Sequence, residues 1–314
     1  MFLPDTAIKN EKDDKLNRAW FSKSLGEQIL KFGDNDSKVI AIYGDWGKGK
    51  TSILNIAISH IENTTKEWEK EEKPIIFRFN PWNFSEQEDL LFTFLRQLFS
   101  AVNHRLPVTK KNFQEQINKL AGALGAFGKI PVAGVPLTAT SKAINLIVPE
   151  ESLENLRAKI DEYFIDLKSK IIIVIDDIDR LTENEIRQIF QLIKINADFP
   201  NTVYLTAFDR TVVEEALTTK QGVSGRDYLE KIVQVGFDIP VIEQDRINDF
   251  LFSNLNKILE SVEMKYWDIT RWGNLFFSSL GKLFTSIRGV KRFLNSLEFN
   301  FQLVSGEVNP IDFI

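Results

Sequence analysis

A glycine-rich loop between an apolar run and a helix-compatible segment constrains the fold of this chain more than any other feature. The apolar run covers 39–43, and the helix-compatible segment covers 51–61. The phosphate-binding pattern G-x-x-x-x-G-K-[ST] is matched by Gly44, Gly49, Lys50 and Thr51. Glycines let backbone N–H groups turn inward around an anion, and the following helix directs its positive end towards that anion. Strand, loop and helix in this order therefore predict a phosphate-binding loop.

We expect the whole loop to contact the phosphates of a bound nucleotide. Its residues are Gly44, Asp45, Trp46, Gly47, Lys48, Gly49, Lys50, Thr51 and Ser52. Lys50 is expected to reach the outer phosphates and to serve catalysis, and the Thr51 hydroxyl is expected to bind Mg²⁺. A plain glycine-rich turn would match the same letters, but the strand before the loop and the helix after it favour the phosphate site.

The composition is that of a globular protein rather than a disordered chain. The chain has 314 residues, 43% of them hydrophobic and 26% charged, and its 25 Phe favour a sizeable core. A net charge of -5 argues against a general nucleic-acid-binding surface but is compatible with a local basic patch. The absence of cysteine excludes disulfides and thiolate metal sites and suits a reducing cytoplasm. Only two histidines are present, so a histidine-built metal site is not expected, and we expect no signal peptide or membrane span.

Strand and helix patterns alternate along the first three quarters of the chain. Apolar runs predict strands at 75–79, 171–175 and 202–207, and helical periodicity appears at 17–32, 90–106 and 183–197. Thr182 and Glu185 form a capping-box pattern at the start of the last of these helices. Alternation of this kind predicts an α/β fold with a mostly parallel sheet and sites at its carboxyl edge.

The pattern changes near residue 240. From 244 onward it is entirely helical, which places a boundary between a core at 1–240 and a helical subdomain at 241–314. Residues 5–16, before the first helix, are polar and predict a loose lead-in.

The core carries an insertion rich in alanine and glycine near 107–150. Its most distinctive part is 120–148, where Lys129, Pro131, Pro136 and Lys142 exclude an ordinary membrane-spanning helix. Three interpretations stay open for this part: a flexible insertion, a partner-binding helical pair, and a segment resting peripherally on a membrane surface, of which the last is least favoured.

Acidic residues follow two of the predicted strands. Asp176 ends the apolar run at 171–175 and is expected to complete the Mg²⁺ shell, while Asp177 is expected to orient or activate the attacking water. The alternative is that both only begin a turn or cap the next helix. Asp209 and Arg210 end the next strand, and they could sense the outer phosphate or form a strand-end salt bridge.

A basic stripe lies on one predicted helix near the end of the chain. Arg288, Lys291 and Arg292 are spaced i, i+3, i+4 and therefore share a helix face. The stripe could be a solvated face, or it could supply a cation to the γ-phosphate.

These motifs together resemble the KAP family of P-loop NTPases, relatives of the AAA+ and STAND ATPases. The matching stretches are 44–52, Phe79-Asn80-Pro81-Trp82, 175–181, 228–234 and 288–295, and they follow the family's order over nearly the whole chain. Trp46 inside the loop and the Asp-Asp-x-Asp-Arg run at 176–180 are more specific than the generic loop pattern.

The resemblance implies a three-layer ATPase core with a helical lid, binding ATP or ADP together with Mg²⁺. It assigns Asp176 to Mg²⁺, Asp177 to the water-activating position and Asp209 to the sensor strand. It also places Arg288 where related ATPases carry a catalytic lid arginine. Lys231 stands where many AAA+ proteins present an arginine finger to a neighbour, and Lys is a poorer bidentate phosphate partner than Arg.

Two functional hypotheses follow from the resemblance, together with a weaker third. Bacterial members resemble phage-exclusion and defence proteins, in which the NTPase is a switch coupled to another domain. We expect this chain to self-associate or to bind a partner effector protein. The first hypothesis is an ATP hydrolase that drives this switch. The second is a nucleotide-gated scaffold with little turnover, self-associating through 228–235. A small-molecule kinase is the third, and the helical tail and the paired acids disfavour it.

Overall fold

A computed structural model describes residues 2–32, 37–84, 90–103, 105, 158, 161–162, 164–165, 167, 169–196, 199–218, 224–260, 267–304 and 307–314. The predicted insertion near 107–150, with its segment 120–148, lies outside the described residues. Within the described ranges, no helix is both long and apolar enough to cross a membrane.

Five parallel strands form the central sheet. They are β1 (Lys38–Tyr43), β2 (Ile75–Phe79), β3 (Ile171–Ile175), β4 (Thr202–Phe208) and β5 (Val235–Asp238). Their order across the sheet is β2-β3-β4-β1-β5, and every neighbouring pair runs parallel. Strands that are neighbours in the sheet but not in the chain require crossover connections, and the helices supply them. The prediction of an α/β fold with a parallel sheet is confirmed.

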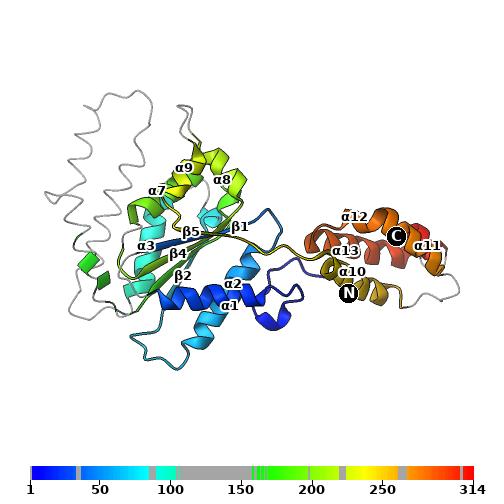
Figure 1. Ribbon diagram of the computed structural model, residues 1–314, viewed down its shortest axis with the longest axis horizontal. Coiled ribbons are helices and arrows are strands. Elements are labelled where there is room, and N and C mark those ends of the chain that lie inside the picture. Colours follow the sequence, from blue (N-terminus) through cyan, green and yellow to red (C-terminus); the bar gives the residue numbers. More distant parts are fainter. Residues whose placement is uncertain are drawn as a thin grey trace. The chain divides into compact units, whose positions relative to one another are not determined.

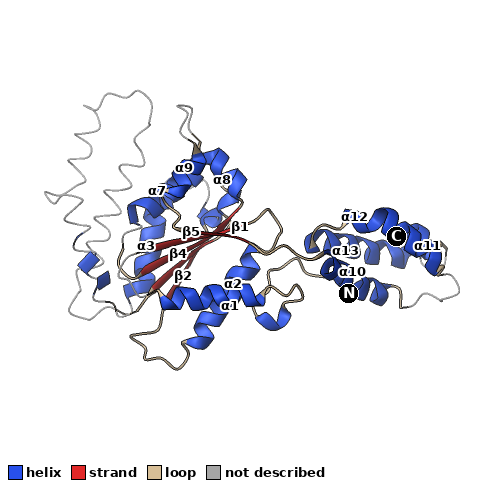
Figure 2. Cartoon of the chain, in the orientation of Figure 1, coloured by secondary structure: helices blue, strands red, loops and turns tan. Residues whose placement is uncertain are grey.

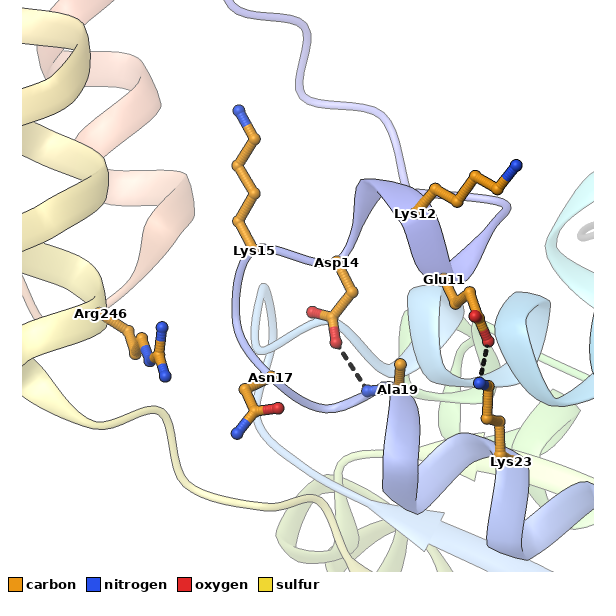
Figure 3. A pocket seen from close by; sticks show the side chains of 8 residues that line it. All are labelled: Glu11, Lys12, Asp14, Lys15, Asn17, Ala19, Lys23 and Arg246. Carbon is orange, nitrogen blue, oxygen red and sulfur yellow. Dashed lines mark hydrogen bonds and ion pairs between the residues drawn. The ribbon is translucent and has the colours of Figure 1, made fainter.

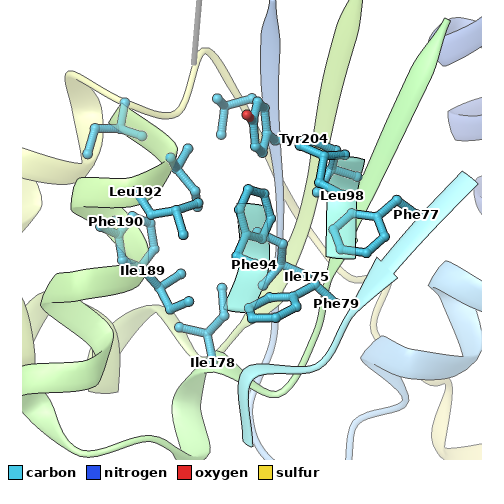
Figure 4. Packing of buried hydrophobic residues seen from close by; sticks show 14 of the residues in the cluster. Phe77, Phe79, Phe94, Leu98, Ile175, Ile178, Ile189, Phe190, Leu192 and Tyr204 are labelled. Atoms are coloured by element: carbon cyan, nitrogen blue, oxygen red, sulfur yellow. The ribbon is translucent and has the colours of Figure 1, made fainter. Parts of the chain in front are cut away.

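The central strands are buried on both faces. Every residue of β3 and β4 is buried, as expected for apolar runs in a parallel sheet covered on both sides. Alternate residues of β3 point to opposite faces: Ile171, Ile173 and Ile175 belong to one large core cluster, and Ile172 and Val174 do not. Figure 4 shows part of this cluster, in which Phe77, Phe79, Phe94, Phe190 and Tyr204 pack together with aliphatic side chains.

Helices cover both faces of the sheet, which makes three layers. Their bounds are α1 (Ala19–Lys31), α2 (Lys50–Thr64), α3 (Leu90–Asn103), α7 (Glu183–Asn196), α8 (Arg210–Leu217) and α9 (Gly225–Glu230). Short 3-10 turns are η1 (Glu11–Asp13), η2 (Pro81–Phe84) and η3 (Ile178–Arg180). Figure 1 shows α1 and α2 on one side of the sheet and α3, α7, α8 and α9 on the other. Gly26 lets α1 approach α2 closely, because a Cβ there would lie 3.0 Å from the carbonyl oxygen of Ala57.

The C-terminal region is helical, as Figure 2 shows. Its elements are α10 (Gln244–Ile258), α11 (Ile269–Leu275), the π-helical turn η5 (Phe276–Leu280), α12 (Gly281–Leu283), α13 (Ile287–Val304) and α14 (Pro310–Phe313). The helices have a core of their own, to which α10 contributes Leu251 and Leu255 and α13 contributes Val290 and Leu294. The i, i+4 spacing within each pair produces the apolar stripe that this packing needs.

The described chain divides into two compact units. One unit holds residues 1–23, 45–56 and 239–314, and the other holds 24–44 and 57–238. Residues 45–52 of the phosphate loop thus belong to the same unit as the N-terminal segment and the C-terminal helices. The second unit contains the five strands together with α3, α7, α8 and α9. The domain boundary predicted near residue 240 stays a prediction.

Candidate functional site

The carboxyl edge of the sheet gathers three of the predicted segments. β4 lies between β1 and β3, and all three strands run parallel, so their carboxyl ends meet at one edge. Gly44 follows β1, and its N–H donates to the carbonyl of Phe208 at 3.2 Å. Asp176 follows β3, and Asp209 follows β4. Sites in parallel sheets form at this edge, because the loops diverge there.

The carboxylate of Asp177 is held by two side chains that belong to the sequence motifs but had been given no role. Asn80, which follows β2, donates from Nδ2 to one oxygen of Asp177 at 3.2 Å. The other oxygen lies 2.8 Å from the Arg180 guanidinium, which in turn lies 5.3 Å from the centre of the Trp82 ring. Asp177 has φ 60° and ψ 28°, and its N–H donates to Oδ1 of Asp176 at 2.9 Å. The carboxylate therefore has one defined position at the sheet edge.

This cluster joins two motifs that are far apart in the chain. Asn80 and Trp82 come from the Phe-Asn-Pro-Trp stretch, and Arg180 comes from the Asp-Asp-x-Asp-Arg run. Adjacency of β2 and β3 brings the two stretches together. Both motifs can be recognised in the sequence, but only the strand order shows that they lie in contact.

Asp209 is a helix cap in the structure. Its carboxylate accepts hydrogen bonds from the N–H groups of Thr211 and Val212 and so begins α8. Arg210 forms an ion pair with Glu214 at 2.7 Å and lies over the ring of Tyr43. Arg210 thus matches the salt-bridge alternative, with a partner one turn further along. The proposed sensor role of Asp209 stays a prediction.

The phosphate loop has the backbone conformation that an anion nest requires. Gly47 and Gly49 have φ of 79° and 94°, values that side-chain-bearing residues rarely adopt. The N–H of Lys48 donates to the carbonyl of Asp45 at 3.3 Å, which closes a tight turn, and α2 begins at Lys50. Lys50 is only 8% exposed, and its Nζ donates to the carbonyl of Asp45 at 3.2 Å. Left-handed glycines, a helix N-terminus and a buried lysine fit a phosphate group.

The N-terminal segment binds to the loop and to α2. Ile8 donates its N–H to the Ser52 hydroxyl at 3.3 Å, and its carbonyl accepts from Nδ2 of Asn55 at 3.1 Å. Arg18 donates to the carbonyl of Lys48 at 2.5 Å. The polar stretch 5–16 is therefore not a loose lead-in throughout, and Ile8 is attached to partners 44 and 47 positions away, which no local sequence pattern reveals.

The predicted lid arginine lies beside the loop within the same unit. Arg288 forms an ion pair with Asp5 at 2.7 Å, and a Cβ on Gly47 would lie 3.3 Å from the Arg288 side chain. Lys291, on the same helix face, donates to the carbonyl of Pro4 at 2.8 Å. Burial lowers the pKa of Lys291, and the nearby Asp5 opposes this effect. Arg288 and Lys291 of the stripe are thus bound to the N-terminal segment.

An open cavity of about 370 Å³ lies between the N-terminal segment and α10 (Figure 3). Its lining residues are Glu11, Lys12, Asp14, Lys15, Asn17, Ala19, Lys23 and Arg246. Both carboxylates have partners: Glu11 is paired with Lys23, and Asp14 accepts from backbone N–H groups. None of the residues predicted for the nucleotide site lines this cavity.

The described residues do not form a metal site by themselves. Among them, no group of three or more His, Cys, Asp or Glu could hold a metal ion. Mg²⁺ is usually held by one or two carboxylates, waters and substrate phosphates rather than by a cage of protein ligands. Asp176 and Thr51 offer the oxygen ligands that Mg²⁺ prefers, so the residue types fit the ion.

Comparison with known protein families identifies the family of this chain. The profile of the KAP family P-loop domain matches residues 18–303. The chain belongs to the KAP family of P-loop NTPases. The resemblance expected from the motifs is confirmed, and membership makes nucleotide binding and nucleoside triphosphate hydrolysis the general chemistry of this KAP domain.

A curated relative is the phage T7 exclusion protein of Escherichia coli strain K12. It is 24% identical over 270 residues, which cover 78% of this chain and 36% of the relative. This chain therefore spans about a third of the length of that relative.

Solved structures with a similar fold have lower sequence identity to this chain. They include the ORC1 protein of Aeropyrum pernix in complex with DNA (TM-score 0.45, 13% identity, covering 98% of this chain and 65% of that one). Drosophila ORC bound to DNA gives a TM-score of 0.47 at 11% identity, covering 100% and 67%. A RuvB mutant of Thermotoga maritima gives 0.43 at 12%, covering 98% and 71%. Similarities with sequence identities and TM-scores this low carry no argument about function.

Proposed function

We propose that this KAP domain is a Mg²⁺-dependent ATP hydrolase whose nucleotide state acts as a switch. The observation that carries the proposal is the strand order β3-β4-β1. It sets the start of the phosphate loop and the acids after β3 at one edge of a parallel sheet, with a single strand between them. A phosphate nest needs a carboxylate at this edge to complete the Mg²⁺ shell, and Asp176 is the residue that follows β3.

Each proposed role follows from the chemistry of the residue. Lys50 compensates the charge of the outer phosphates, and the N–H groups of the loop hold them in position. Thr51 and Asp176 would hold Mg²⁺, which supplies charge neutralisation on the β- and γ-phosphates when bound. Arg288 would add a cation to the γ-phosphate, and Asp209 would respond to its presence.

The proposed reaction is hydrolysis of the terminal phosphoanhydride. Asp177 orients a water and accepts its proton, while the water oxygen bonds to the γ-phosphorus. The bond from that phosphorus to the β–γ bridging oxygen breaks, and ADP and phosphate leave. Asn80 and Arg180 hold the carboxylate of Asp177 in place, so the base does not have to be ordered during the reaction.

Phosphate release in the presence of ATP tests the proposal. We expect hydrolysis by the wild type that EDTA abolishes, and a loss of about 100-fold in Asp177→Asn, since a general base contributes at least this much. Asn keeps the shape of Asp and tolerates the left-handed conformation, so binding should survive. Asp268→Asn is the control, because Asp268 is a carboxylate cap of α11 outside the strand-end cluster. Equal hydrolysis in wild type and Asp177→Asn would refute the assignment.

We propose further that the switch serves bacterial antiphage defence, in the cytoplasm. The support is the similarity to a protein named for exclusion of phage T7. The expected result is fewer phage plaques on cells that express the wild type than on cells that express Lys50→Ala at the same level. Equal plaque counts with both would remove this part of the proposal and leave the ATPase assignment intact.

A second candidate function is a nucleotide-gated scaffold with little turnover. The favouring observation is that Asn80 and Arg180 already occupy two of the about four acceptor positions of the Asp177 carboxylate, so fewer positions remain for a water. Arg226 and Lys231 at α9 are exposed and could meet a second copy or an effector. Light scattering with ATP, with ADP and without nucleotide separates the functions: a scaffold changes its mass between these states, and an unchanged mass excludes it.

A further inference from the structure

Arg18 is a buried arginine beside the phosphate loop that the sequence motifs left unassigned. It is only 5% exposed, and its Nη1 donates to the carbonyl of Lys48. Its Nε is buried and has no hydrogen-bond partner among the described residues. Burial of a charged side chain costs free energy of desolvation, so the bond from Nη1 of Arg18 to the loop carbonyl needs an explanation.

Charge pairing does not provide this explanation. Burial lowers the pKa of Arg18, and the negative charge of Asp14 raises it by a smaller amount. Asp14 is engaged elsewhere, because its two oxygens accept from the N–H groups of Leu16, Arg18 and Ala19 at 2.9, 2.6 and 2.6 Å. Figure 3 shows its side chain turned towards the N–H of Ala19. In the described part of the chain, the guanidinium of Arg18 therefore serves the loop carbonyl rather than an ion pair.

The bond to this carbonyl sets the orientation of a whole peptide plane. The Lys48–Gly49 peptide is trans, so the carbonyl of Lys48 and the N–H of Gly49 point in opposite directions. A flip of this plane would change the sign of φ at Gly49, and glycine accepts either sign with little preference. The loop sequence thus leaves the orientation open, and the bond from Arg18 selects one orientation.

We propose that Arg18 is a positioning residue for the phosphate loop. By holding the Lys48 carbonyl, it keeps the N–H of Gly49 turned into the anion nest, where it donates to the β-phosphate of a nucleotide. That N–H has no hydrogen-bond partner among the described residues, so it is available for a ligand. The inference rests on the proposed nucleotide site and adds a residue from outside its motifs.

Titration calorimetry tests the proposal. It measures the affinities of the wild type, Arg18→Gln and Arg18→Lys for AMP, ADP and ATP. We expect Arg18→Gln to weaken ADP and ATP about 10-fold, the effect of one misdirected hydrogen bond to a charged group, and to weaken AMP by no more than about 2-fold. Arg18→Lys keeps a donor for the carbonyl and should restore most of the ADP affinity. The control is Arg187→Gln, which also removes an arginine that donates to main-chain carbonyls, those of Ala216 and Thr218.

A second measurement does not depend on nucleotide binding. Trp46 is 57% exposed and lies within the loop, so the ¹⁹F resonance of 5-fluorotryptophan at this position reports the conformation of the loop. Trp46→Phe assigns the resonance. We expect Arg18→Gln, but not Arg187→Gln, to shift or split it in the protein without nucleotide.

The outcomes separate this inference from the proposed function. Absence of any nucleotide binding by the wild type would overturn the proposed function, and the Trp46 resonance would still decide whether Arg18 positions the loop. An unchanged resonance in Arg18→Gln, or equal losses for AMP and ADP, would overturn the positioning role.

Discussion

Replacement of Gly49 by alanine tests whether the left-handed conformation of the loop is required. Gly49 has φ 94°, and a Cβ built there lies 3.4 Å from Nη1 of Arg18, which is an ordinary contact. The substitution therefore meets no severe steric overlap. Its cost is the backbone strain of an L-residue in this region, about 1–3 kcal/mol.

The strain must appear either in stability or in nucleotide affinity. If the loop keeps its conformation in the free protein, unfolding becomes easier by about 1–3 kcal/mol and ADP affinity changes little. If the free loop relaxes to a negative φ, stability is kept, but nucleotide binding must restore the strained form and loses the same free energy. The two losses should therefore sum to about 1–3 kcal/mol, equivalent to about 5-fold to 150-fold in an equilibrium constant.

Urea unfolding and calorimetric titration with ADP measure the two losses. Gly273→Ala is the matched control, because Gly273 lies within α11, has no neighbour within 4 Å of a built Cβ, and does not have a positive φ. Alanine there should stabilise the protein by up to about 1 kcal/mol, through helix propensity, without changing ADP affinity. The reasoning is refuted if Gly49→Ala leaves both stability and affinity at wild-type values.

Three further substitutions test the packing of the unit that contains the sheet, each by the free energy of unfolding in urea. Gly225→Ala should cost about 3 kcal/mol, since its Cβ would lie 1.9 Å from the carbonyl oxygen of Glu214 and overpacking must separate α8 from α9; wild-type stability would contradict this approach of the helices. Lys170→Met should cost about 1–3 kcal/mol, because its ammonium donates to three carbonyls at the end of α1; a neutral result would mean that water replaces it. Phe199→Ala should cost about 3–5 kcal/mol, since Phe199 is buried and stacks on Phe164 at 4.8 Å; a loss below about 1 kcal/mol would show that the cavity collapses.

The sheet could be predicted from the sequence because its strands carry a local signal. The strand predicted at 171–175 coincides with β3, since a run of β-branched residues favours a strand buried on both faces. The capping-box pattern is also confirmed in part: Glu185 accepts from the N–H of Thr182 at 2.9 Å. Signals of this kind lie within a few residues of the structure that they determine.

Contacts between distant segments could not be predicted in this way. The partners of Lys170 at the end of α1 are about 140 positions away, and those of Arg18 and Asn80 also lie on other elements. Only the strand order and the helix packing bring these groups together. Asp209 is different, since an aspartate directly before a helical stretch is a local N-cap signal that points to its observed role.

Binding of Mg²⁺–ATP by the wild type and by Lys50→Met, measured by calorimetric titration, tests the central claim most directly. Met keeps the length and the apolar stem of Lys50 but removes the charge that faces the phosphates, so the fold should survive. The account predicts one ATP per chain for the wild type and an affinity about 10-fold to 150-fold lower for Lys50→Met, the loss of a charge-assisted bond to phosphate. Equal affinity for both proteins, or no binding by a folded wild type, would contradict it.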